Sequence, residues 1–386
     1  MAKQRAIFED VSTTTAQRET PRTGSIDRHP KGARRAIRGW LIMLFALVCV
    51  MIVVGGMTRL TDSGLSITEW RPVTGAIPPM SEAMWLEEFE KYRQIDQYQI
   101  VNRGMTLEEF KVIYWWEWGH RQLGRVIGLV WGVGFLFFWL TKRIPTGWTS
   151  RLLALGALGG LQGAIGWWMV ASGITAGEGM VSVASYRLAT HLGLAFVILG
   201  MIAWYTFLLN RPEAELIAAR RGREARLYSM TTGLMHFAFL QILLGALVAG
   251  IDAGRGYTDW PLMNGVFIPP ELLAMQPLWT NFFENPATTQ FIHRKAGYLL
   301  AAFALVVWLR GRKSTHSATR AAYHAMFAVM VAQIALGVFT VLHGAPWQLG
   351  IAHQATAVLL WVLIIRARHL AQFPRFDRLR KQGAAV

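Results

Sequence analysis

The stretch that decides the fold occupies residues 117–125 and reads Glu117-Trp118-Gly119-His120-Arg121-Gln122-Leu123-Gly124-Arg125. It leads directly into an apolar run from Val126 to Leu140, a pattern typical of a helix entering a membrane. Glu117 and His120 are three residues apart, so they share one helix face. Ionisable side chains at such a place are costly, and they indicate a functional site. The alternative is a boundary carboxylate that pairs with Arg121 and a histidine that reaches the polar interface.

The composition is that of a membrane protein. Of the 386 residues, 53% are hydrophobic and only 16% are charged. The formal net charge of +16 does not point to nucleic acid, because the basic residues cluster in short segments between apolar runs, as the positive-inside rule describes. We therefore expect membrane lipid around the chain and no nucleic acid. The one cysteine, Cys49, excludes an intrachain disulfide, a cysteine-based metal site and an iron–sulfur cluster.

Eight apolar runs are long enough to cross a bilayer, which takes a helix of about 20 residues. They lie at roughly residues 39–57, 121–141, 152–171, 188–209, 229–251, 291–310, 321–342 and 349–367. The predicted fold class is therefore an all-α integral membrane protein with eight transmembrane helices.

Arginine and lysine gather in alternate connections: after the second, fourth, sixth and eighth runs. These connections are expected in the cytoplasm together with both termini, as cytoplasmic tails at 1–38 and 369–386. The connections at about 58–116 and 252–290 are long and are expected outside. The polar N-terminal segment has no apolar core, so it is not a secretory signal.

The chain contains an internal repeat. Four helices carry matching residues in the same order, namely Asp62-x-Gly64 with Asp252-x-Gly254, Glu69-Trp70 with Asp259-Trp260, His120-Arg121-x-x-Gly124 with His293-Arg294-x-x-Gly297, Gln162 and Gly166 with Gln333 and Gly337, and His191 with His353. We predict two pseudo-symmetric four-helix bundles, an N-terminal half at 39–210 and a C-terminal half at 229–368, joined by a cytoplasmic linker at 211–228. Because four helices separate equivalent positions, the repeats are parallel rather than inverted.

Four histidines have a common position in this topology. His120, His191, His293 and His353 each lie in the first turns of an even-numbered helix that enters from outside. One such histidine alone would be read as a polar group at the interface. Two neutral imidazoles on facing helices of one bundle can bind a haem iron from both sides. We therefore predict two haem sites, one in each half. Zinc is less favoured because no cysteine or clustered carboxylate completes a tetrahedral set.

The two halves differ beside the first of these histidines. Glu117 in the N-terminal half corresponds to Gln290 in the C-terminal half. A carboxylate can relay a proton or stabilise a cation, whereas an amide cannot titrate. This difference predicts chemistry in the N-terminal half and electron transfer in the C-terminal half. Arg121 and Arg294 follow the histidines, where they can meet haem propionates or lipid headgroups.

Two motifs resemble those of the haem A synthase family. The first motif runs from the end of the first apolar run into the outer connection and reads Gly55-Gly56-Met57-Thr58-Arg59-Leu60-Thr61-x-Ser63-Gly64-Leu65-Ser66, followed by Glu69-Trp70-x-Pro72-x-x-Gly75-x-x-Pro78-Pro79. The second motif is Glu117-x-x-His120-Arg121-x-x-Gly124-Arg125. The first motif is long and specific. The resemblance covers essentially the whole chain from the first apolar run to the eighth.

The resemblance implies a membrane enzyme of the bacterial cytoplasmic (inner) membrane that converts haem O to haem A for cytochrome oxidase. The C8 methyl group of haem O would become a formyl group by successive hydroxylation. Carried over to this chain, the family pattern gives His293 and His353 to haem b, and His120 and His191 to the substrate haem. Glu117 would be the catalytic carboxylate. Haem O synthase and an unidentified electron donor are the implied partners, and the oligomeric state, a homo-oligomer included, stays open.

One feature departs from part of the family. Some members carry a cysteine pair in an outer loop, and this chain resembles the cysteine-free branch of alphaproteobacteria and mitochondria. Electron delivery through outer-loop thiols is therefore excluded. Two other classes of protein compete with the enzyme: a di-haem membrane cytochrome b for quinol-linked electron transfer, which does not account for the Glu117/Gln290 difference, and a proton-coupled transporter, which does not account for the paired histidines.

Overall fold

The computed structural model describes residues 31–174 and 179–375. The predicted tails at 1–38 and 369–386 therefore lie largely outside the described residues. The elements, in chain order, are α1 (Lys31–Leu60), η2 (Thr74–Ala76), α2 (Glu82–Arg93), η3 (Gln97–Val101), α3 (Leu107–Leu140), α4 (Thr149–Val170), α5 (Ser185–Leu209), α6 (Glu213–Arg221), α7 (Ala225–Gly250), η4 (Leu278–Thr280), α8 (Asn281–Glu284), α9 (Pro286–Gly311), α10 (Ser317–Leu342) and α11 (Trp347–Gln372).

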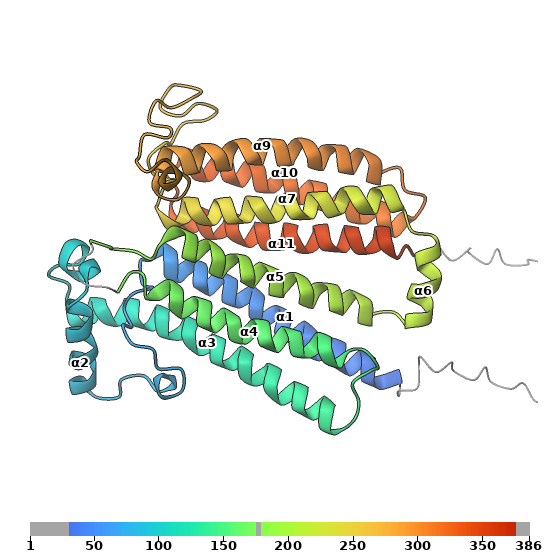
Figure 1. Ribbon diagram of the computed structural model, residues 1–386, viewed down its shortest axis with the longest axis horizontal. Coiled ribbons are helices and arrows are strands. Elements are labelled where there is room, and N and C mark those ends of the chain that lie inside the picture. The colour runs from blue at the N-terminus through green and yellow to red at the C-terminus, as the bar shows by residue number, and fades with distance from the viewer. Residues whose placement is uncertain (1–30, 175–178, 376–386) are drawn as a thin grey trace, which may run out of the picture.

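Eight helices in the described part of the chain are long and apolar enough to span a membrane: α1, α3, α4, α5, α7, α9, α10 and α11. The predicted all-α membrane fold is thus confirmed. In Figure 1 the helices α1, α3, α4 and α5 form one group, and α7, α9, α10 and α11 form the other. Each group is one of the two expected four-helix bundles. The loops that carry α2 and α8 lie at one end of the molecule, and α6 lies at the opposite end (Figure 1).

Helix α3 is longer than its apolar run predicts. It begins at Leu107 rather than near residue 121, after a capping box in which Thr106 and Glu109 satisfy each other's backbone N–H groups. The first turns of α3 are polar and stand outside the apolar span, so hydropathy alone misses them. Glu117 and His120 consequently lie well inside the helix. The prediction that His120 lies in the first turns of its helix was wrong.

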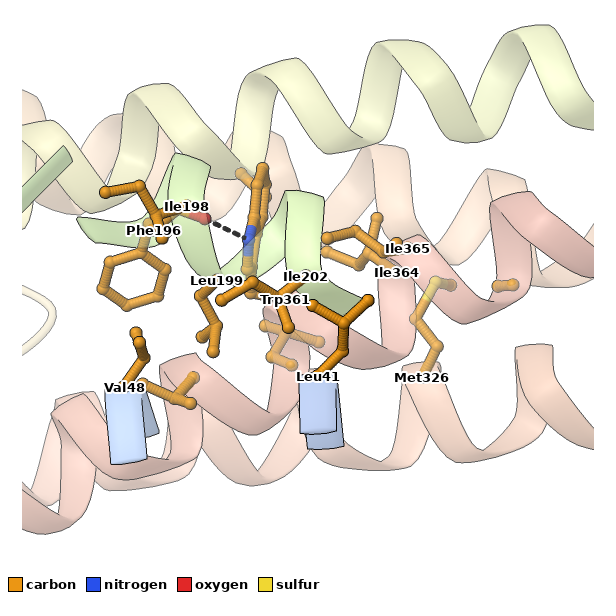
Figure 2. Packing of buried hydrophobic residues seen from close by; sticks show 14 of the residues in the cluster. Leu41, Val48, Phe196, Ile198, Leu199, Ile202, Met326, Trp361, Ile364 and Ile365 are labelled. Carbon is orange, nitrogen blue, oxygen red and sulfur yellow. Dashed lines mark hydrogen bonds between the residues drawn. The ribbon is translucent and has the colours of Figure 1, made fainter. Parts of the chain in front are cut away.

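The two bundles meet along α5. Figure 2 shows the indole of Trp361, from α11, pointing at α5, where its Nε1–H donates to the Phe196 carbonyl at 2.9 Å. Small residues allow this approach, since a Cβ on Gly200 would lie 2.9 Å from the Trp361 indole nitrogen and one on Gly193 would lie 2.6 Å from Leu243 of α7. Close packing of this kind brings α5 and α11, which carry His191 and His353, into direct contact.

An ion pair joins the halves at the end that carries α2. Arg59, in the last turn of α1, contacts the Asp62 carboxylate at 2.7 Å and the Asp252 carboxylate at 2.8 Å. Asp62 and Asp252 are equivalent positions of the repeat, and both adopt a positive φ, 51° and 52°. The same turn therefore ends α1 and α7, which supports the repeat seen in the sequence.

Candidate functional site

The structure brings His120 and His191 together. His120 projects from α3 and His191 from α5, and their ring centroids lie 6.4 Å apart at an interplanar angle of 68°. An imidazole nitrogen binds a metal such as zinc at about 2 Å, so two rings on opposite sides of one metal have centres on the order of 6 Å apart. The observed spacing fits a metal held between the two rings.

The second pair has the same construction in the other half. His293 lies on α9 and His353 on α11, within electrostatic range of each other. Among the residues that the structure describes, no group of three or more His, Cys, Asp and Glu side chains could hold a metal. Each pair therefore suits a metal whose remaining ligands come with it, as the ring nitrogens of haem do. The structure pairs the histidines as predicted, and their role as haem ligands stays a prediction.

A glycine of a neighbouring helix lies against each histidine ring. A Cβ added at Gly55 would lie 3.0 Å from the His120 ring, and one at Gly166 would lie 2.8 Å from the His191 ring. In the C-terminal half, a Cβ at Gly245 would lie 3.0 Å from His293, and one at Gly337 would lie 3.0 Å from His353. Any other residue would push on the ring, because real Cβ atoms seldom come this close. The glycines thus set the space between the helix that carries each ring and its neighbour.

A glutamine side chain lies beside three of the four rings. The amide nitrogens of Gln162, Gln241 and Gln333 donate to the backbone carbonyls of His191, His293 and His353 at 2.9, 2.9 and 3.1 Å. The same nitrogens approach the imidazole Nδ1 atoms at 3.2, 3.0 and 3.3 Å. Outer-shell groups of this kind orient metal-binding rings.

The amide oxygen of each of these glutamines is buried and has no hydrogen-bond partner. The amide nitrogen donates to the histidine carbonyl, so each glutamine ties the backbone of its histidine to the neighbouring helix. The sequence prediction used Gln162 and Gln333 only as markers of the repeat, and it missed Gln241. The signal that could have found all three is a glutamine four residues before a helical glycine.

Glu117 is buried, with 3% of its surface exposed, and each carboxylate oxygen has partners. One oxygen accepts from the Ser66 hydroxyl at 2.8 Å and from the Ile67 N–H at 2.9 Å. The other accepts from the Arg121 guanidinium at 2.6 and 3.0 Å. The ion pair with Arg121 is therefore real, and the carboxylate is also bound to the first outer loop. This set of donors holds the anion in one position on the α3 face that carries His120.

Gln290 donates a hydrogen bond to the second outer loop, whereas Glu117 accepts hydrogen bonds from the first. Its amide nitrogen donates to the Tyr257 carbonyl at 3.2 Å, where Tyr257 is the repeat equivalent of Ile67. The difference between Glu117 and Gln290 thus extends to their surroundings, since the carboxylate accepts from loop groups while the amide donates to one. At this position of the repeat, only the N-terminal half has a carboxyl group.

Arg121 and Arg294 anchor the outer loops. Arg121 donates to the carbonyls of Ile67 and Glu69 at 2.8 and 3.0 Å. Arg294 donates to the carbonyls of Tyr257 and Asp259 at 2.7 and 2.9 Å, the equivalent positions of the second loop. These contacts give both guanidinium groups structural partners. Contact with haem propionates stays a prediction for both.

The first outer loop has an apolar core of its own, which holds the partners of Glu117 in place. Leu65 and Ile67 pack there with the aromatic rings of Phe89, Tyr92 and Phe110. The Tyr92 hydroxyl donates to Gln97 Oε1 at 2.9 Å and accepts from the Asn102 amide at 2.7 Å, and burial raises the pKa of Tyr92 to about 12. The loop segment that binds Glu117 is thus a packed structure and not a loose connection.

A cavity of about 290 Å³, lined by both charged and apolar side chains, lies between this loop and α3. Its lining includes Arg121, which holds Glu117, together with Glu69, Glu88 and Arg125. None of the four paired histidines lines it. The cavity therefore lies on the loop side of the Glu117–Arg121 pair.

The fold and the site define a multi-pass membrane protein with two internal histidine pairs of the kind that bind haem, one of them beside a buried carboxylate. Comparison with known proteins identifies the family. A model of the COX15-CtaA family, described as cytochrome oxidase assembly protein, matches residues 38–365, and the chain belongs to this family.

Several curated relatives share most of their sequence with this chain. The heme A synthase of Ruegeria sp. (strain TM1040) is 67% identical over 96% of this chain and 97% of its own length. The heme A synthase of Ruegeria pomeroyi is 64% identical over 98% of this chain and 100% of its own length. The heme A synthase of Paracoccus denitrificans (strain Pd 1222) is 64% identical over 96% of this chain and 97% of its own length. The family resemblance found in the sequence is confirmed.

Proposed function

We propose that this chain is a haem A synthase, a membrane-bound oxidoreductase that oxidises the C8 methyl group of haem O to the formyl group of haem A. The near full-length identity to curated relatives of that name supports the assignment. The observation that carries it is the buried Glu117 on the helix face of His120, in one half only. A di-haem electron carrier needs no such difference between its halves.

The substrate haem is assigned to His120 and His191, and a resident haem b to His293 and His353. The charge of Glu117 supports this division, because the second half has the neutral Gln290 in its place. Haem, when bound, supplies the one-electron chemistry of its iron. The glycines and glutamines beside the rings hold the imidazoles in position.

Glu117 is the group that handles protons in this proposal. Every oxidation step from a methyl to a formyl group removes protons as well as electrons. A carboxylate held by Ser66, Ile67 and Arg121 can accept such a proton or stabilise positive charge nearby. The cavity beside Arg121 lies next to the ion-pair partner of this group.

The protein is further proposed to lie in the bacterial cytoplasmic membrane with both termini in the cytoplasm. The basic connections after the second, fourth, sixth and eighth spanning helices support this orientation. Haem O would come from a haem O synthase in the same membrane. Electrons would reach the C-terminal half from a donor other than an outer-loop thiol, since the only cysteine is Cys49 of α1.

Haem analysis tests the function directly. The chain is expressed in a host that makes haem O but no haem A, and haem is extracted from the membranes and from the purified protein. We expect haem A in the membranes, and haem b together with a farnesylated haem in the protein. Haem b alone would support the electron carrier, and a protein without haem would support a transporter.

A further inference from the structure

One of the four histidines lacks the glutamine that the other three have. Gln162, Gln241 and Gln333 each stand four residues before the glycine that packs on a histidine ring. The fourth glycine, Gly55, is preceded at this distance by Met51. Met51 and Gln241 are equivalent in the repeat, because each lies on the first helix of its half.

Met51 occupies the position that Gln241 has in the other half, but it cannot donate the hydrogen bond that Gln241 donates to the His293 carbonyl. A Cβ on Gly124 would lie 3.5 Å from the Met51 terminal methyl, and one on the equivalent Gly297 would lie 3.3 Å from Gln241 Nε2. The two side chains thus occupy the same position against the next helix. A thioether donates no hydrogen bond, so the His120 carbonyl and ring receive nothing from Met51.

The ring of His120 is also turned differently from the other three. In His191, His293 and His353 the ring atom nearest to a Cβ built on the neighbouring glycine is Cε1, and the next nearest is Nδ1. The glycines are Gly166, Gly245 and Gly337 in that order. In His120 the ring atom nearest to a Cβ built on Gly55 is Nε2, at 3.0 Å, and the next nearest is Cδ2. Its opposite edge therefore faces the neighbouring helix. The two arrangements differ by a half-turn of the ring about its Cβ–Cγ bond, and no amide fixes which of them His120 takes.

We propose that Met51 makes His120 the exchangeable ligand of the substrate site, whereas amide-held His191, His293 and His353 stay fixed. The inference rests on the proposed function. A site that takes up haem O and releases haem A in each cycle needs one ligand that dissociates from the iron. A site with a resident haem needs no such ligand. Met51 is thus a positioning residue, which acts by leaving the His120 ring free to turn.

The exchange of the two residues between the halves tests this proposal. Met51→Gln supplies the missing amide, and Gln241→Met removes one from the other pair. The readout is the rate at which haem passes from each purified protein to excess apomyoglobin in detergent, with farnesylated haem and haem b told apart by extraction. Outer-shell partners change metal affinity typically by about 10–100-fold.

We expect Met51→Gln to slow the release of farnesylated haem about tenfold and to leave the release of haem b unchanged. Gln241→Met should speed the loss of haem b about tenfold and leave the farnesylated haem unaffected. Met51→Leu, which keeps the volume and adds no donor, should release haem like the parent protein. Met51→Gln should also raise the low-spin fraction of the N-terminal haem.

Equal release rates in Met51→Gln, Met51→Leu and the parent would overturn the proposal, provided that the haem b spectrum shows the C-terminal half intact. A parent-like Gln241→Met would overturn it independently of any folding defect caused by glutamine in α1. The release assay is repeated with the protein loaded with added haem O, which is farnesylated, so it does not require haem A to be made. A chain that makes no haem A yet shows these rate changes would refute the function and leave the ligand inference standing.

Discussion

Glu117 is the residue at which the two halves differ in charge. We predict that Glu117→Gln, which copies Gln290, leaves the protein folded with haem b bound, because the two side chains have similar volume and helix propensity. It removes the carboxylate that shares the α3 face of His120. Haem A formation should fall by about 10²–10⁴-fold, with haem O or a hydroxylated haem accumulating.

Haem analysis of cells that express the variant gives the answer. Near-normal haem A would leave Glu117 as a structural partner of Arg121 and of the first outer loop. Arg121→Lys is the matched control. It keeps the charge but loses the forked contacts to Ile67 and Glu69, so it should lower stability more than Glu117→Gln does.

The histidines of the C-terminal half give a second prediction at this scale. Replacing His293 or His353 by Ala removes one axial ligand, so the stable low-spin signal of haem b should be lost in each single variant. His343→Ala, at the C-terminal cap of α10, is the control and should keep the signal. Absorption spectra of the purified proteins decide the matter. Full haem b with an unchanged spectrum in both single variants would mean that the ligands lie elsewhere.

At the scale of the element, helix α4 carries both a critical glycine and a neutral one. A Cβ at Gly166 would lie 2.8 Å from the His191 ring, whereas one at Gly163 meets nothing within 4 Å. We expect Gly166→Ala to displace the ring and to lower substrate-haem occupancy about tenfold or more. Gly163→Ala should be neutral or slightly stabilising, because alanine is the better helix former.

Haem content per purified protein separates the two alanine variants, and the haem b spectrum shows in both that the second half is intact. Equal farnesylated haem in Gly166→Ala and Gly163→Ala would show that ring contact with α4 does not matter. The comparison depends on one helix only, so differences in membrane insertion are small.

At the scale of the whole molecule, the two long outer loops lie at one end and α6 at the other (Figure 1). We predict that a reporter fused to the C-terminus reports the cytoplasm, because the basic connections lie on that side. A reporter inserted after Gly104, between η3 and α3, should report the opposite side. A periplasmic signal from the C-terminal fusion would reverse the orientation and would place the Glu117 loop in the cytoplasm.

The sequence by itself determined the membrane class, the eight spans, the two parallel halves, the four histidines and the Glu117/Gln290 difference. These features are carried by run length, composition and the offset of short motifs, all of which are local in the chain. The family resemblance came from the same local motifs. Helix ends were less well predicted, as α3 shows, because a polar turn outside the membrane carries no hydropathy signal.

Only the tertiary structure decided what surrounds each of these residues. The partners of Glu117 lie about 50 residues away in the first outer loop, and each histidine packs on a glycine of another helix. The contrast between Met51 and Gln241 became visible in the same way, since their partners His120 and His293 lie on other helices. Periodicity places a side chain on a face of its own helix, and helix packing decides which face of another helix it meets.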